Sequence, residues 1–134
     1  MVPTKNSGLQ RAAAQGAPAV SGRSSRNKGA RGERKTAAEL NERCPEDMEV
    51  KRGIGQVRAG DEVPDVDGID CLWIEVKTQK RGNPRAALKQ AREAAPPGRI
   101  PIAVIRDDRQ RPFMAMDWED FLDLFEEYWQ VKTM

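Results

Sequence analysis

The chain has 134 residues, of which 33% are charged and 38% apolar, which fits one domain with a modest core. It contains no histidine, which excludes histidine general bases, Ser-His triads and histidine-ligated zinc. It has no apolar run of ~20 residues that could span a bilayer and no secretory signal, and Cys44 and Cys71 form no metal-ligand pattern. We therefore expect a cytoplasmic protein in a reducing setting.

The formal net charge of +2 hides a strong separation of charge along the chain. Residues 1–35 carry eight Lys and Arg against one Glu, and residues 113–134 carry six Asp and Glu against one Lys. A basic block beside a folded domain predicts a polyanionic partner, with nucleic acid the first candidate. A solvated basic tail without a partner is the alternative.

Residues 1–27 are poor in large apolar side chains and rich in Ala, Gly, Ser and Arg. They bury too little surface to offset the entropy of ordering, so we predict a disordered basic tail followed by a folded domain over residues 28–134. That domain opens with a predicted helix that runs to about residue 44 and ends at Pro45.

The inward face of this first helix is predicted from helical spacing, and it comprises Glu33, Ala37, Leu40 and Cys44. Glu33 lies near the first turn, where the helix dipole favours a carboxylate. It is either a helix-start glutamate without a role or part of a site.

The remaining segments predict the order αβββαββα, a mixed sheet with helices on both faces. Asn83 and Pro84 form a helix start, with Asn as the N-cap. The aromatic stripe of the last helix, which Asp117 caps, is predicted to be core. The expected strands are residues 48–52, 63–68, 72–78, 100–105 and 112–116, and the expected later helices begin at 83–84 and 117.

The stretch from Pro64 to Lys77 carries the chemistry of the chain. Glu75 and Lys77 interrupt an apolar run that otherwise reads as a strand, and residues two apart in a strand share a face. Parity therefore places Glu75 and Lys77 on one face, and Leu72, Ile74 and Val76 on the face that packs against a helix. A solvent-exposed surface ion pair of Glu75 and Lys77 is the alternative.

The turn between the second and third strands decides whether Glu75 has a carboxylate partner. A tight turn at Asp67 and Gly68 would leave Asp65 roughly 17 Å from Glu75, whereas a turn over residues 68–71 places the two directly opposite. Opposed carboxylates repel unless one is protonated or a cation lies between them, and one or two carboxylates with several waters suit Mg²⁺. Asp61, Asp67 and Asp70 are lower-ranked alternatives as the first carboxylate.

These residues resemble the signature of the PD-(D/E)XK nuclease superfamily, with Pro64-Asp65 followed ten residues later by Glu75-Val76-Lys77. The helix opening at Lys28-Gly29-Ala30-Arg31-Gly32-Glu33 and the segment Leu88-Lys89-Gln90-Ala91 resemble parts of archaeal and phage-type Holliday-junction resolvases. The resemblance covers about residues 28–125, and it implies a restriction-endonuclease-like αβββαβ core within an α/β fold.

The resemblance also implies a catalytic set and a cofactor. It implies Mg²⁺, which Mn²⁺ can replace, bound by Asp65, Glu75 and the Val76 carbonyl, with Glu33 as an accessory acid. Lys77 would be the catalytic lysine, and Gln90 would position Lys77 or the phosphate unless it is an ordinary surface residue.

The implied function is hydrolysis of DNA phosphodiester bonds, with four-way junctions as the expected substrate and a homodimer as the expected assembly. The alternatives are a restriction-type, nicking or repair endonuclease of the same fold, and a non-catalytic DNA-binding module. The residues expected to follow the DNA backbone are Arg26, Lys28, Arg31, Arg34, Lys51 and Arg52. No membrane partner is expected.

Overall fold

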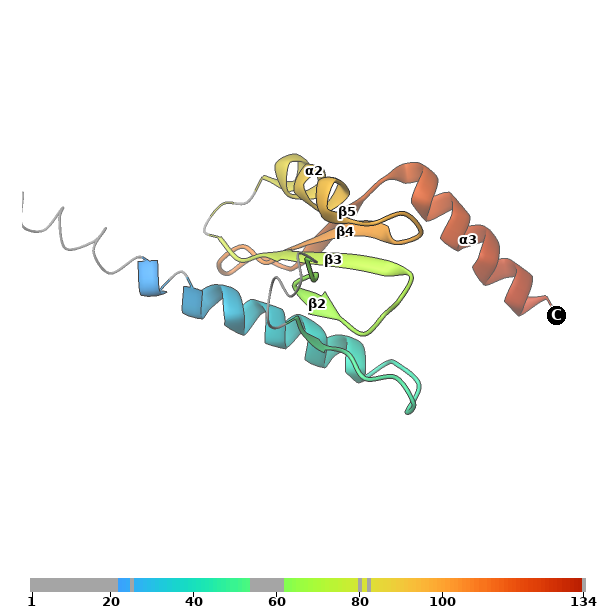
Figure 1. Ribbon diagram of the computed structural model, residues 1–134, viewed down its shortest axis with the longest axis horizontal. Helices are drawn as coiled ribbons and strands as arrows, with labels where there is room; N and C mark the ends of the chain where they lie inside the picture. The colour runs from blue at the N-terminus through green and yellow to red at the C-terminus, as the bar shows by residue number, and fades with distance from the viewer. Residues whose placement is uncertain (1–21, 25, 54–61, 80, 82, 134) are drawn as a thin grey trace, which may run out of the picture.

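A five-stranded mixed sheet organises the chain in the computed structural model, which describes residues 22–24, 26–53, 62–79, 81 and 83–133 (Figure 1). The strands lie in the order β1-β2-β3-β4-β5, and every neighbouring pair is antiparallel except β3 and β4, which are parallel. The strands are β1 (Lys51–Arg52), β2 (Val66–Asp67), β3 (Leu72–Lys77), β4 (Ile100–Ile105) and β5 (Phe113–Met116).

Two helices cover opposite sides of this sheet, and a third leads away from it (Figure 1). The N-terminal helix, residues 26–41, packs on one face, while α2 (Pro84–Ala94) packs on the other and connects the parallel strands β3 and β4. Asn83 caps α2 as predicted, since its side chain accepts a hydrogen bond from the Ala86 N–H at 3.1 Å. The predicted α/β class and mixed sheet with helices on both faces are confirmed.

The core is divided between the two faces of the sheet. The larger cluster lies under the N-terminal helix, and its buried members are Ala37, Val50, Val66, Ile74, Val76 and Ile102. The smaller cluster lies under α2, and its buried members are Ala87, Leu88, Ala103 and Ile105. Small alanines let α2 approach the sheet closely, and the residues of this cluster come from α2, β4 and β5 rather than from β3.

The first two strands are shorter than predicted because side chains take the place of backbone partners. Asn41 accepts from the Val50 N–H at 2.7 Å and donates to the Val50 carbonyl, so the ladder begins at Lys51. Pro64 has no N–H to contribute, so β2 begins beyond it at Val66. Helical structure also begins earlier than predicted, since residues 22–24 and 26–27 are helical; the rest of the expected tail lies outside the described residues.

The prediction that the last helix forms core is wrong. α3 (Trp118–Lys132) has no buried residue, and Trp118 is 67% exposed. Asp117 occupies the N-cap position, but its carboxylate makes no capping hydrogen bond and instead accepts from Arg92 of α2 at 2.9 Å. The pattern correctly predicts a helix, but its aromatic face is exposed, and Leu124 is the residue of α3 that lies beside Ile74, Ile102 and Val104 of the sheet. Within the described part of the chain, no helix has the length and apolar character needed to cross a membrane.

Gly68 fixes the turn that sets the register of the β2–β3 hairpin, and it gives a test of the fold. Its φ is +120°, and a Cβ there would clash with the Glu49 carbonyl oxygen and lie 2.9 Å from the Val50 Cα. We expect Gly68→Ala to lower the free energy of unfolding by about 3 kcal/mol or more, as measured by urea denaturation.

Gly98→Ala is the matched control for this substitution. Gly98 also has a positive φ, of +92°, but a Cβ there meets nothing within 4 Å. Backbone strain alone should cost about 1–2 kcal/mol. Equal losses in the free energy of unfolding would contradict this account, because they would show that a Cβ pressed against the Glu49–Val50 backbone adds no cost to the backbone strain.

Candidate active site

The side chains of β3 alternate between the core on one face of the sheet and the candidate site on the other, as the sequence predicts. Ile74 and Val76 belong to the cluster beneath the N-terminal helix, so Trp73, Glu75 and Lys77 face the other side of the sheet. Glu75 is only 7% exposed, and it is the one buried acidic residue in the described part of the chain. A surface ion pair at this position is therefore excluded.

Asp65 is the partner of Glu75 across the hairpin. Val66 lies opposite Ile74 in the antiparallel ladder, which places Asp65 opposite Glu75 on the next rung. The turn occupies residues 68–71, as that pairing requires, and the Leu72 N–H bonds to the Ile69 carbonyl at 3.0 Å. The Asp65 carbonyl accepts from the Gly53 N–H at 2.8 Å, so its backbone groups point toward β1 and away from β3. Asp65 and Glu75 therefore form the closer, non-hydrogen-bonded kind of pair.

Pro64 and Asp65 together rearrange the end of the ladder. The Val76 N–H faces Pro64 in this register, and it donates to the Asp65 carboxylate at 2.8 Å. A strand residue points its N–H and its carbonyl toward the same edge, so the Val76 carbonyl also faces Pro64. Since Pro64 has no N–H, the Val76 carbonyl lacks the hydrogen-bond donor that the neighbouring strand usually supplies. This carbonyl lies next to the carboxyl groups of Asp65 and Glu75.

The pKa of Glu75 is raised from 4.5 to about 8. Burial is the largest cause, and the hydrogen bond and negative charge of Asp65 add to it, while the Trp73 indole and the Lys77 ammonium act in the opposite direction. Near neutral pH Glu75 therefore keeps its proton beside Asp65.

Trp73 and Arg99 support the carboxylate pair, and the sequence reasoning missed both. The Trp73 indole N–H donates to Glu75 Oε1 at 3.2 Å, and the ring is buried. Arg99 lies over that ring at 5.2 Å and donates to the Leu72 carbonyl at 3.0 Å. The sequence could have shown that Trp73 and Glu75 share a face, because they are two residues apart in a strand. It could not have shown the contact of Arg99 with Leu72, because 27 residues separate them.

Lys77 ends β3 on the face of Glu75, and its side chain is partly exposed. Its backbone carbonyl accepts from the Arg106 N–H at 2.8 Å, which anchors the end of the strand to the segment after β4. The ammonium is close enough to Glu75 to lower the pKa of that carboxyl. Asp65, Glu75 and Lys77 are thus brought together as predicted.

Glu33 is held by Arg52 rather than by a residue of this cluster. It accepts from Arg52 Nε at 2.6 Å, and Arg52 pairs with Val66, so its side chain shares the face covered by the N-terminal helix. Glu75 occupies the opposite face. Helical spacing placed Glu33 correctly on the inward stripe, but it could not reveal that Arg52 is the nearest partner.

The other candidates occupy different places. Gln90 is exposed on α2, and its side chain makes no hydrogen bond with another described residue. Asp67 accepts from the Gly68 N–H and pairs with Arg99 at 3.5 Å, Asp70 is exposed in the turn, and Asp61 lies outside the described residues.

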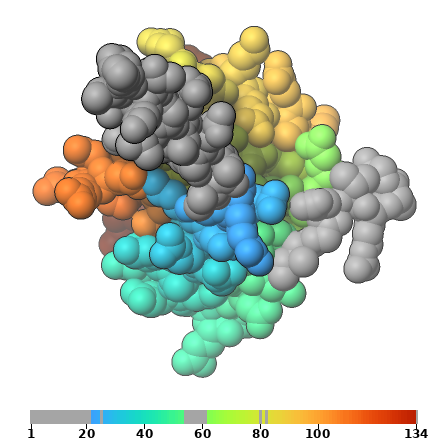
Figure 2. All heavy atoms as spheres, turned by 90° about the vertical axis from the view of Figure 1, so that its left-hand side faces the viewer, coloured from blue at the N-terminus to red at the C-terminus, as the bar shows by residue number. Residues whose placement is uncertain are grey.

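The basic residues of the N-terminal helix gather at the same end of the molecule as Lys77. Gly32 packs directly against Thr78, the residue after β3, and Lys28 pairs with Asp108. Seen from this end, the start of the helix occupies the centre of the face (Figure 2).

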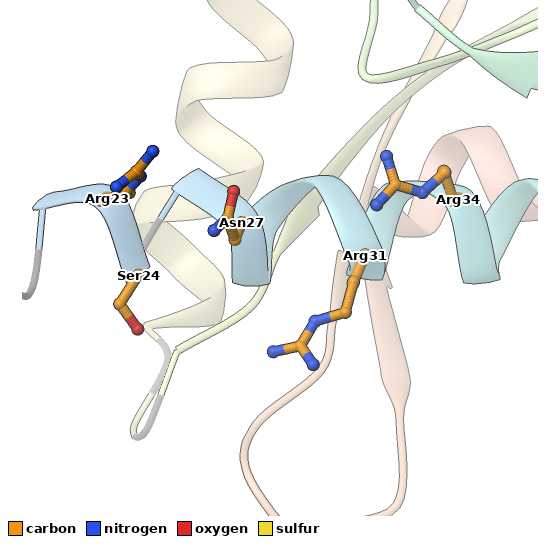
Figure 3. Close-up of a pocket in the computed structure, with 5 residues that line it drawn as sticks. All are labelled: Arg23, Ser24, Asn27, Arg31 and Arg34. Atoms are coloured by element: carbon orange, nitrogen blue, oxygen red, sulfur yellow. The ribbon is translucent and has the colours of Figure 1, made fainter.

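Three arginines and Asn27 line a shallow hollow on this helix. Figure 3 shows Arg23, Arg31 and Arg34 extending their guanidinium groups from the helical surface. None of these three arginines, nor Arg26, pairs with a carboxylate of the described chain, in contrast to Arg52, Arg92, Arg99 and Arg106. Lys51 is exposed on β1 and lies 3.8 Å from Glu49. The hollow is therefore a surface of uncompensated positive charge.

The donor set at Asp65 and Glu75 fits a hard divalent cation. No group of three or more His, Cys, Asp or Glu side chains that could hold a metal occurs among the described residues. Mg²⁺, however, is commonly bound through one or two carboxylates and keeps several waters. Two adjacent carboxylates and the Val76 carbonyl supply oxygen ligands of that kind.

Searches against protein-family models, curated proteins and solved structures find no match for this chain.

The raised pKa of Glu75 predicts how stability depends on pH. Between pH 4.5 and about 8 the folded chain holds a proton that the unfolded chain has released. The free energy of unfolding should therefore fall as pH rises through this range, by an amount on the order of a few kcal/mol. Glu75→Gln stays neutral at every pH, so it should remove this fall in urea unfolding measured at pH 5, 7 and 9.

Glu62→Gln is the control, because Glu62 is an exposed glutamate just before the same hairpin. It should unfold with the pH dependence of the unmodified chain. An unmodified chain that matches Glu75→Gln at all three pH values would contradict the raised pKa of Glu75.

Proposed function

We propose that this chain is a metal-dependent endonuclease that hydrolyses DNA phosphodiester bonds, with the core of the PD-(D/E)XK superfamily. The observation that carries the proposal is the pairing of the buried Glu75 with the half-buried Asp65, with Lys77 on the same face of β3. Burial of the Glu75 carboxyl beside a second carboxyl costs stability, and a cation between them would reverse that cost. A purely structural strand has no need of this arrangement.

The chain's own residues account for the remaining requirements of phosphodiester hydrolysis. Asp65, Glu75 and the Val76 carbonyl would hold Mg²⁺, which when bound withdraws charge from a phosphate and lowers the pKa of a coordinated water. Lys77 would stabilise the negative charge that develops on the phosphate oxygens. Trp73 would keep the Glu75 carboxylate in its orientation through the indole N–H.

The positive hollow supports DNA as the substrate. Arg23, Arg31 and Arg34 lie at the end of the molecule where β3 finishes, so a strand that contacts them can also reach Lys77. The resemblance of the opening helix and hairpin to Holliday-junction resolvases favours a four-way junction among DNA substrates. A nuclease of the same core that cuts linear duplex and a module that binds DNA without cutting are the rival functions.

Cleavage of a synthetic four-way junction with Mg²⁺ tests the proposal against both rivals. The chain should cut the junction in preference to linear duplex and single strands. Asp65→Asn and Glu75→Gln should each lower the cleavage rate by about 1,000-fold or more, because each removes a charged metal ligand. DNA binding should persist in both variants.

Asp70→Asn is the matched control, since Asp70 is an exposed turn carboxylate in the same hairpin. It should cleave at the normal rate. Binding without cleavage of any substrate would refute the enzyme, and equal cutting of linear duplex would refute junction selectivity alone.

The salt dependence of DNA binding tests the role of the positive hollow. In Glu75→Gln, where cleavage is absent, the further change Arg31→Ala/Arg34→Ala should reduce the slope of log K against log salt by about 2, since each phosphate contact contributes ~0.9. Arg43→Ala/Lys132→Ala removes the same charge from side chains outside the hollow. An equal reduction in that control would assign the effect to net charge rather than to the hollow.

A further inference from the structure

Phe113 begins β5 in the same row of the sheet as Lys77. Lys77 lies opposite Ile105 in the β3–β4 ladder, and Ile105 lies opposite Phe113 in the β4–β5 ladder. Residues that lie opposite one another across a sheet share a face, so Phe113 belongs to the face that carries Glu75 and Lys77. Neighbouring strands lie about 4.8 Å apart, which places the backbone of Phe113 roughly 10 Å from that of Lys77.

The core does not bury the ring of Phe113. Ala103, Ile105 and Ala115 lie on the same face of the sheet and pack in the cluster under α2. Phe113 lies two residues before Ala115, at the start of the strand, and it is 47% exposed. A flat apolar ring that stays open beside a polar site can stack against a second flat group.

Positive charge exceeds negative charge around this ring. Phe113 lines an open hollow of about 670 Å³, and the other described residues that line it are Arg81, Asp107, Gln110 and Arg111. The loop between β4 and β5 supplies most of them, and it lies beside the start of the N-terminal helix, where Asp108 pairs with Lys28 (Figure 2). We call this second hollow the Phe113 hollow, and it lies at the same end of the molecule as the three arginines of the N-terminal helix.

The exposed rings near the end of α3 have the opposite electrostatic setting. Phe125 and Trp129 are each 50% exposed, and Glu126 is the charged residue that lines the surface hollow beside them. The helix as a whole carries five acidic residues and one lysine. Negative charge of this density repels a polyanion, so charge favours DNA at Phe113 and disfavours it at Phe125.

We propose that Phe113 stacks on an unstacked base of the DNA substrate, while Arg81 and Arg111 contact the adjoining phosphates. A strand with one phosphate at Lys77 covers the roughly 10 Å to Phe113 within about three nucleotides, at a rise of ~3.4 Å each. Neighbouring bases cover both faces of every base inside a continuous duplex, so the free face must come from a branch point or a single strand. The inference rests on the proposed function and names a residue that selects branched or unpaired DNA over linear duplex.

Fluorescence anisotropy of labelled DNA with the Glu75→Gln chain, in the absence of divalent ions, tests this stacking. Phe113→Leu removes the aromatic face but keeps an apolar side chain, so it should weaken binding of a four-way junction by about 10-fold. Binding of a linear duplex with the sequence of the junction arms should not change, which also shows that the variant is folded. Phe113→Trp keeps an aromatic face and should bind the junction at least as tightly as Phe113 does.

Phe125→Leu is the matched control, because it removes a similarly exposed ring from the acidic helix, and it should leave junction binding unchanged. Normal junction binding by Phe113→Leu, or equal weakening on junction and duplex, would overturn the stacking proposal. The assay involves neither a metal nor cleavage, so the two proposals fail separately. Selective loss of junction binding in a chain that never cuts would refute the nuclease alone, and normal binding by Phe113→Leu in a chain that cuts would refute the stacking alone.

Discussion

The contact between the carboxyl groups of Asp65 and Glu75 is the constraint on which the rest of the structure depends. It is unfavourable in itself, since burial and the proximity of a second carboxyl raise the pKa of Glu75 to about 8. The fold nevertheless enforces it through the Val66–Ile74 register, the Val76 N–H and the Trp73 indole. Packing of Ile74 and Val76 on the opposite face stabilises β3 and offsets the free-energy cost of holding the two carboxyl groups together.

The two ends of the molecule differ in chemistry. At the end where β3 finishes, Lys77 lies near a helix whose arginines have no acidic partner in the described chain. The C-terminal helix, α3, combines an acidic half with a row of exposed aromatic rings. The first surface carries positive charge, and the second combines negative charge with exposed aromatic rings. The same charge separation is visible in the sequence.

The sequence predicted those features that depend on parity and spacing. The two faces of β3, the turn over residues 68–71 and the Asn83 cap follow from local patterns, and the structure confirms them. Features that depend on distant contacts were not predictable. Arg52 holds Glu33 across 19 residues, Arg99 supports the turn across about 30, and α3 has no buried residue although its pattern resembles that of a core helix. Amphipathicity predicts that a helix buries one face, but it does not identify the surface that buries it.

The central claim is that the Asp65–Glu75 pair exchanges the proton of Glu75 for a divalent cation, and calorimetric titration with Mn²⁺ tests it most directly. Titrations at pH 7 in buffers of different ionisation enthalpy should show one bound cation and release of about one proton, because Glu75 must lose its proton to become a ligand. The double variant Asp65→Asn/Glu75→Gln should bind no cation and release no proton. Equal affinity and proton release in the double variant would contradict the account.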